Sequence, residues 1–347
     1  MKFDVVVGNP PYQENIEHRG EQPSIYHNFI RLAHEISKKS CLITPGRFLF
    51  NVGSTPKEFN QYMLNNKNVK IIDYFLKSNI VFHNTDIKGG VVITYFDKEK
   101  TYKEIGVFTN FEELNGIIRK VDNENLDSIN KLLYSNTSFK YTKDLYIDFP
   151  EFNSRLSGGS KRYLASSAFN VLPEIFYDEK PNTNDEFIKI LGRQNNQRIY
   201  KYINKKYIKD HPNLYKYKII VPSSNGSGAL GEVLSTPLIG EPLIGEPLIG
   251  HTETFISFGA FDNRDIAENM LKYIKSKFAR CMLGVLKVTQ GNKTKHVWSK
   301  VPLQDFTNKS DIDWSKSIPE IDQQLYKKYN LSDKEINFIE EKVKAME

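Results

Sequence analysis

The sequence predicts an α/β protein, and three observations lead to this fold class. Apolar strand-like runs and amphipathic helices alternate over about the first hundred residues, which is the pattern of part of a doubly wound sheet. Near residue 151 the composition changes to basic and aromatic stretches, which indicates a second, α+β domain. The 347 residues are also enough for two domains, each with its own core.

The first strand is expected at the very beginning of the chain. Phe3 and residues 5–7 form a short apolar run, rich in β-branched residues, that ends at Gly8 and predicts a buried strand. Asn-Pro-Pro-Tyr follows at residues 9–12. The two prolines fix two φ angles and lack backbone N–H groups, and Asn9 is extended because it precedes a proline. We therefore expect a rigid loop at the carboxyl end of a strand, where open α/β sheets bind ligands.

The chemistry of this loop suits a flat base that carries an exocyclic amine. The Asn9 side-chain oxygen and the Pro10 carbonyl can each accept one hydrogen from the N6 amine of adenine. Both bonds together favour a pyramidal nitrogen whose lone pair can point at a methyl group. The Tyr12 ring can stack on a base that has left its helix. A Pro-Pro turn after an ordinary strand is the alternative interpretation.

The strand and the loop together resemble the catalytic motif of the amino-group DNA methyltransferases. The match is to the S-adenosylmethionine-dependent N6-adenine enzymes of restriction–modification systems, and it implies catalytic roles for Asn9, Pro10, Pro11 and Tyr12. It also implies double-stranded DNA as the substrate. The family carries a second aromatic side chain that packs against the flipped base. Phe82 is the candidate, with a core phenylalanine as the alternative.

The remaining elements fit a partial Rossmann-like methyltransferase sheet followed by an α+β target-recognition domain. We expect helices over residues 26–37 and from Thr55 onward, and strands over 41–43, 69–75 and 90–96. Thr55, Pro56 and Glu58 indicate a capping box, and one long helix is expected over 264–284. The predicted parts are the catalytic domain at 1–105, a connector at 106–155, the target-recognition domain at 156–310 and a helical segment at 311–347.

Two basic segments are candidates for contact with DNA. Residues 189–218 contain many cations, interleaved tyrosines and four amides at 194–197, with Asp210 as the single acidic residue. A second basic segment is the turn that follows residue 284. Cations can contact phosphates, while Arg and amide side chains can contact base edges. A solvated charged face is the alternative. The predicted DNA-binding residues are Arg193, Gln194, Asn195, Arg198, Lys201, Lys205, Lys206, Lys287, Thr289 and Gln290.

A direct repeat of Pro-Leu-Ile-Gly-Glu occupies residues 237–250. A proline at every fifth position disfavours a regular helix or a central strand. The pattern therefore predicts a tolerated insertion in a surface loop.

Charge, cysteine content and apolar patterning indicate which partners and which compartment suit the protein. The net charge of +6 is compatible with nucleic acid binding. Cys41 and Cys281 lie far apart in apolar stretches, as expected for free thiols in the cytoplasm. Apolar runs are too short for a membrane span, and the spacing of the histidines predicts no metal site.

The resemblance also implies a glycine-rich turn and an acidic residue that bind S-adenosylmethionine ahead of the Asn-Pro-Pro-Tyr loop. Only eight residues precede Asn9, and the best later match, at 258–262, has one glycine. We therefore expect the main cofactor-binding half to lie outside this chain, in a longer protein or on a separate chain. Two other functions stay open: a catalytically dead DNA-binding specificity fragment, and a methyltransferase acting on RNA or protein glutamine.

Overall fold

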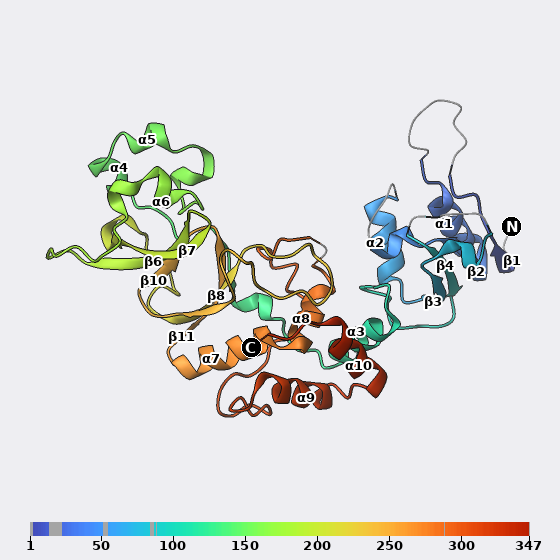
Figure 1. The fold of residues 1–347 in the computed structure, drawn as a ribbon. Helices are drawn as coiled ribbons and strands as arrows, with labels where there is room; N and C mark the ends of the chain where they lie inside the picture. The colour runs from blue at the N-terminus through green and yellow to red at the C-terminus, as the bar shows by residue number, and fades with distance from the viewer. Residues whose placement is uncertain are drawn as a thin grey trace. The chain divides into compact units, whose positions relative to one another are not determined.

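The computed structural model describes residues 3–13, 23–50, 55–83, 87, 89–287 and 289–346. The chain divides into two compact units, Met1–Asn115 and Gly116–Glu347, each with its own hydrophobic core. Both units combine helices with β-sheet (Figure 1), so the prediction of an α/β protein is confirmed. Within the described residues, no helix has both the length and the apolar character of a membrane span.

The first unit contains a four-stranded sheet with the strand order β1-β2-β4-β3. Its strands are β1 (Phe3–Gly8), β2 (Ser37–Pro45), β3 (Val69–Phe75) and β4 (Val91–Asp97). β1 and β2 are parallel and are connected by helix α1 (Tyr26–Ile36), whereas β4 lies antiparallel between β2 and β3. β1 is therefore an edge strand of this sheet.

Helices α1 and α2 (Lys57–Asn65) pack against the sheet and together with β2, β3 and β4 contribute to the core of the first unit. The predicted capping box of α2 is absent, because Thr55 and Glu58 have other partners. The Thr55 hydroxyl lies 3.0 Å from the Tyr26 hydroxyl, and Glu58 forms an ion pair with Arg31 at 2.9 Å. Both contacts join α2 to α1, so these polar residues connect the two helices instead of capping one of them.

The second unit contains two sheets. One has the order β10-β6-β7 and the other has the order β5-β11-β8-β9. β6 and β7 form an antiparallel hairpin whose tip extends beyond the rest of this unit (Figure 1), and β10 pairs with β6 in parallel. The strands are β5 (Leu133–Tyr134), β6 (Phe187–Gln194), β7 (Gln197–Asn204), β8 (Tyr217–Pro222), β9 (Leu243–Gly245), β10 (Ile249–His251) and β11 (Phe255–Phe261).

The helix predicted over residues 264–284 is two helices, α7 (Arg264–Lys275) and α8 (Lys277–Gly284). Ser276 separates them and caps α8 with its side chain. Asp322 accepts hydrogen bonds from the first two backbone amides of α8, at 3.0 and 2.9 Å. The other helices are α3 (Glu112–Asn123), α4 (Asp144–Asp148), α5 (Phe152–Arg155), α6 (Ala168–Val171), α9 (Ile318–Lys328) and α10 (Asp333–Lys342).

The Pro-Leu-Ile-Gly-Glu repeat is part of the folded second unit, so the prediction of a tolerated surface loop is wrong. The second copy supplies β9, which pairs with β8, and the third supplies β10, which pairs with β6. The buried Lys218 ammonium donates to the carbonyls of Glu246 at 3.1 Å and Ile249 at 2.8 Å. Pro242 and Pro247 lie just before the two strands, where the missing N–H interrupts no ladder.

Candidate active site and nucleic-acid interface

The Asn-Pro-Pro-Tyr loop leaves the carboxyl end of β1. Pairing of Gly8 with Leu42 fixes this end of the strand against β2. Asn9 is exposed, and its side chain makes no hydrogen bond to the described residues, so its amide is available to a ligand. Asn9 and Pro10 border a pocket of about 210 Å³, which is otherwise lined mainly by apolar side chains of α1, β1 and β2.

Tyr12 and Phe82 lie side by side. Their ring centroids are 6.5 Å apart and their planes are at 67°. The Tyr12 carbonyl accepts a hydrogen bond from Ile25 at 3.1 Å, and the Phe82 amide donates to Ser78 at 2.8 Å, so backbone contacts hold both residues. Both rings are half-buried. The fold thus brings the predicted base-pocket residue to the predicted catalytic loop.

The phenol of Tyr12 is held in a neutral form. Burial raises the pKa of Tyr12 to about 12, because desolvation disfavours the phenolate. Its buried hydroxyl has no hydrogen-bond partner among the described residues. The ring therefore offers an aromatic surface, and the described residues around it include no hydrogen-bond partner that would make the hydroxyl a base.

The tip of the β6–β7 hairpin gathers four of the predicted DNA-binding residues. Arg193 pairs with Arg198 across the hairpin, and Gln194 pairs with Gln197. The turn residues Asn195 and Asn196 have φ angles of 51° and 59°, which is the left-handed pair that a two-residue type I′ turn requires. The tip therefore presents guanidinium and amide groups on a two-stranded ribbon.

A pocket of about 290 Å³ lies at this tip and includes residues that sequence reasoning missed. Ser166, Ser167 and Asn170 line it together with residues 193–196. Gln194 donates to the Asn170 side-chain oxygen at 3.0 Å. Ser166 and Ser167 precede α6 and Asn170 lies within it. This segment has no sequence pattern of its own, so only the fold relates the three residues to the hairpin.

The three lysines that follow on β7 and after it are neutralised by acids. Lys201 pairs with Asp178 at 2.7 Å, and Lys205 pairs with Asp210 at 2.8 Å. Lys206 pairs with an aspartate of α4 at 2.6 Å. Two of these acids lie far from the basic stretch in the sequence. The linear run of lysines therefore overstates the positive charge of this surface.

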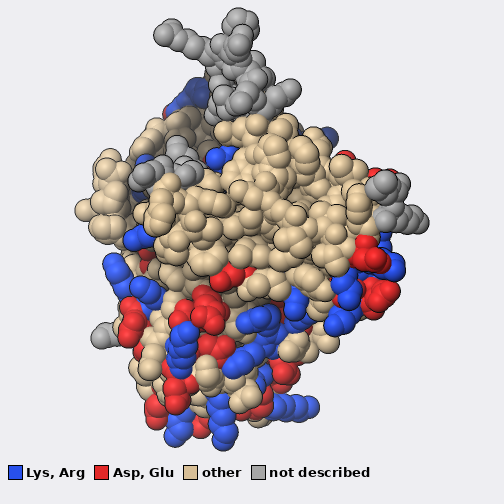
Figure 2. Space-filling view, turned by 90° about the vertical axis from the view of Figure 1, so that its right-hand side faces the viewer, with Lys and Arg blue, Asp and Glu red and all other residues tan. Residues whose placement is uncertain are grey.

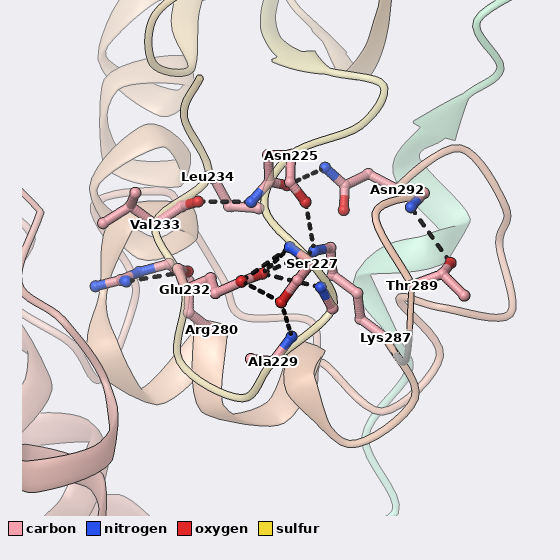
Figure 3. A network of polar contacts seen from close by, with 12 residues as sticks. Asn225, Ser227, Ala229, Glu232, Val233, Leu234, Arg280, Lys287, Thr289 and Asn292 are labelled. Carbon is pink, nitrogen blue, oxygen red and sulfur yellow. Dashed lines mark hydrogen bonds and ion pairs between the residues drawn. The ribbon is translucent and has the colours of Figure 1, made fainter. Parts of the chain in front are cut away.

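Lys287 is buried, which contradicts its predicted contact with DNA. Its side chain is 5% exposed and its ammonium donates to the Asn225 carbonyl at 3.0 Å, with Glu232 at 3.8 Å (Figure 3). Burial lowers the pKa of Lys287. The ammonium thus fastens one loop to another. Thr289 and Gln290, by contrast, are exposed.

A comparison with known protein families matches the part of the chain that contains the Asn-Pro-Pro-Tyr loop. Residues 1–82 match the family model described as Eco57I restriction-modification methylase. An "uncharacterized adenine-specific methylase" of Mycoplasma pneumoniae is 31% identical over 108 residues, which are 30% of this chain and 25% of that protein. The resemblance to restriction–modification adenine methylases is therefore confirmed, and this chain spans about a quarter of that relative's length.

Two solved structures are also similar to this chain. The type IIG restriction endonuclease BpuSI has a TM-score of 0.28 at 11% identity, over 98% of this chain and 54% of its own. The type IIL restriction-modification enzyme MmeI, solved in complex with DNA, has a TM-score of 0.30 at 8% identity, over 98% of this chain and 56% of its own.

Proposed function

We propose that this chain is the part of a site-specific DNA adenine-N6 methyltransferase that captures the target base. The observation that carries the proposal is the Asn-Pro-Pro-Tyr loop at the end of β1, with Phe82 against Tyr12 at 6.5 Å. The match of residues 1–82 to a restriction-modification methylase family supports it.

In the proposed mechanism, adenine leaves the duplex and enters beside Asn9 and Pro10, next to the aromatic pair of Tyr12 and Phe82. The Asn9 side-chain oxygen and the Pro10 carbonyl each accept one N6 hydrogen, which directs the nitrogen lone pair away from the ring plane. Tyr12 and Phe82 hold the base by aromatic contact. S-adenosylmethionine supplies the methyl group when it is bound.

The pocket beside the Asn-Pro-Pro-Tyr loop would hold only the methyl-donor end of this cofactor. Asn9 and Pro10 border the pocket of about 210 Å³, but its lining has no acidic side chain for the ribose hydroxyls. We infer that the sheet β1-β2-β4-β3 is half of a Rossmann-like methyltransferase sheet. The parallel pair β1-β2 with its crossover helix supports this arrangement.

A separate chain, or further residues, would supply the cofactor-binding half beside β1. Three apolar side chains of this edge strand are exposed, namely Phe3, Val5 and Val7, as are Phe29 and Leu32 of α1. Figure 2, which views the molecule from the side of β1, shows a broad uncharged surface there. An apolar sheet edge of this kind is suited to pair with another strand.

The second unit would contact the DNA duplex through the tip of the β6–β7 hairpin. A two-stranded ribbon fits the major groove, where Arg recognises guanine and Gln or Asn recognises adenine. Arg193, Gln194 and Asn195 are placed at this tip, and Thr289 and Gln290 are a second exposed segment. Residues 156–310 would thus form the target-recognition domain.

The test is a methyl-transfer assay with the Asn9→Ala variant, supplied with a complete cofactor half. We expect loss of adenine methylation while duplex binding stays close to wild type, because different residues bind the phosphates. Asn9→Asp, which keeps the oxygen acceptors, is the matched variant and should retain part of the activity. Methylation at a near wild-type rate by Asn9→Ala would refute the mechanism. DNA binding by a wild type that methylates no adenine would favour the dead specificity fragment.

A further inference from the structure

A pocket in the second unit gathers cations that the predicted DNA-binding residues do not include. It has a volume of about 520 Å³ and is bordered by several tyrosines and threonines. No acidic residue lines it. Its five cationic residues are Lys140, Lys143, Lys161, Arg162 and Lys209.

The backbone brings these cations together from three segments of the chain. A β-bridge joins Lys140 to Tyr163. The Tyr141 amide donates to the Arg162 carbonyl at 3.0 Å, and the Lys209 amide donates to the Lys140 carbonyl at 2.8 Å. The positions of the cations are therefore set by the fold, not by flexible side chains alone.

The five cations differ from the lysines of β7 and its following turn in having no acidic partner. All five are exposed, and none forms an ion pair with a described residue. The nearby Asp210 is already bonded to Lys205 and Tyr215. Like charges around one cavity repel each other, and a bound anion would remove that repulsion.

The pocket shares its hydrophobic core with the β6–β7 hairpin. Tyr141 and Ile208, which flank the pocket, belong to the same cluster of buried residues as Ile188 and Ile190 of β6. A ligand in the pocket would therefore be held at a fixed position relative to the hairpin tip. This is what a contact to the DNA backbone needs in order to set the register of base-reading side chains.

We propose that this pocket binds a phosphodiester group of the DNA backbone, at a site separate from the hairpin tip. Lysine supplies point charges to phosphate, and arginine can form two parallel hydrogen bonds to it. The half-buried Tyr146 and Tyr163 add aromatic surface beside the cations. The proposal rests on the proposed function, because it takes duplex DNA as the partner.

The test compares the salt dependence of duplex DNA binding by the full chain and two triple variants. The pocket variant is Lys140→Gln, Arg162→Gln and Lys209→Gln, and the matched control is Lys201→Gln, Lys205→Gln and Lys206→Gln. The slope of log K against log salt is negative, and each lost phosphate contact reduces its magnitude by about 0.9. We expect the magnitude of this slope to fall by about 2–3 in the pocket variant. In the control, whose lysines are already paired with acids, it should fall by less than about 1.

Circular dichroism and thermal unfolding establish that both variants are folded, and the single charge reversal Arg162→Glu repeats the test with less disturbance. An unchanged slope in the folded pocket variants would overturn the proposal. Binding of inorganic phosphate or adenosine monophosphate that the pocket variant loses, while its binding of duplex stays intact, would also overturn it in favour of a free nucleotide. A methylation failure with intact, pocket-dependent binding would refute only the proposed function.

Discussion

The ring of Phe82 lies edge to face against the ring of Tyr12, with 6.5 Å between the two centroids. Tyr12 ends the loop that follows β1, whereas Phe82 comes after β3 and a short 3₁₀ helix, Ser78–Ile80. The fold thus joins two aromatic residues from distant parts of the sequence at the Asn-Pro-Pro-Tyr loop. The two rings can therefore be tested together for their contact with the flipped adenine.

We predict that Tyr12→Ala and Phe82→Ala each weaken capture of the flipped adenine, by on the order of 1–3 kcal/mol for each lost aromatic contact. Tyr12→Phe should lose little, because the Tyr12 hydroxyl has no partner among the described residues. Fluorescence of 2-aminopurine at the target position measures capture separately from methyl transfer. Equal loss in Tyr12→Phe and Tyr12→Ala would show that the hydroxyl, and not the ring, matters.

The second prediction concerns the repeat. The first copy of the repeat forms a turn closed by a β-bridge between Thr236 and Gly240. Deleting residues 242–246 removes one copy, so the two remaining copies cannot supply this turn, β9 and β10 at once. We expect a clear drop in the melting temperature, at about 2–4 °C for each kcal/mol lost. A deletion variant that melts with the wild type would show that the repeat is dispensable for folding.

Lys218→Met is the matched point variant for the repeat. It keeps much of the side-chain volume but removes the ammonium that binds the carbonyls of Glu246 and Ile249. A buried carbonyl left without its donor costs about 1–3 kcal/mol. Thermal unfolding of this variant should therefore also occur at a lower temperature, with the repeat itself unchanged in length.

The third prediction is a dependence of stability on pH through His34. This side chain is buried, stacks on Phe96 with 4.0 Å between ring centroids, and lies 2.8 Å from the Tyr62 hydroxyl. Burial lowers the pKa of His34 to about 4. The folded state favours the neutral ring. The contribution of His34 to the free energy of unfolding is therefore complete above pH 6.5, the ordinary pKa of histidine, and is lost as the pH falls toward 4.

The pKa difference corresponds to about 3 kcal/mol of unfolding free energy across that window. Urea unfolding at several pH values measures it. His34→Gln, which does not titrate but can still bond to Tyr62, should show a smaller loss of stability between pH 6.5 and 4. The same loss in the variant and the wild type would assign the acid sensitivity to other groups.

The sequence was informative where a local pattern determines the structure. Apolar runs ended by glycine or proline correctly located β1 and β2. The predicted burial of β1 is wrong, because this strand lies at the edge of its sheet and is largely exposed. The Asn195-Asn196 turn also lies in a stretch selected for its amides. These features depend on neighbours along the chain, which the sequence contains.

Features that depend on partners from elsewhere in the fold could not be predicted. Lys201 and Lys206 have acidic partners outside the basic stretch, and Lys287 is buried against a loop more than fifty residues away. The prolines of the repeat indicated a loop, because the rule against proline in strands does not show that each lies just outside one. The basic pocket combines three segments, none of which is prominent by itself.

The last prediction concerns the edge strand β1, where Val5 and Val7 are 56% and 74% exposed. Among the described strands, β1 pairs only with β2. Its other edge pairs with no described strand and lies beside apolar side chains, which favours pairing with another strand. We expect this chain by itself to self-associate, and Val5→Lys to shift it toward the monomer, because a charge at such an edge opposes pairing.

Sedimentation velocity at several concentrations measures this equilibrium. The matched control is Ile147→Lys, which places the same charge on an apolar residue of the second unit that is 70% exposed. The control should leave self-association unchanged, since Ile147 lies on a short helix with no open sheet edge. A wild-type chain that stays monomeric at high concentration would contradict self-association through the edge of β1. An equal effect of both substitutions would mean that general surface charge, and not the edge of β1, controls association.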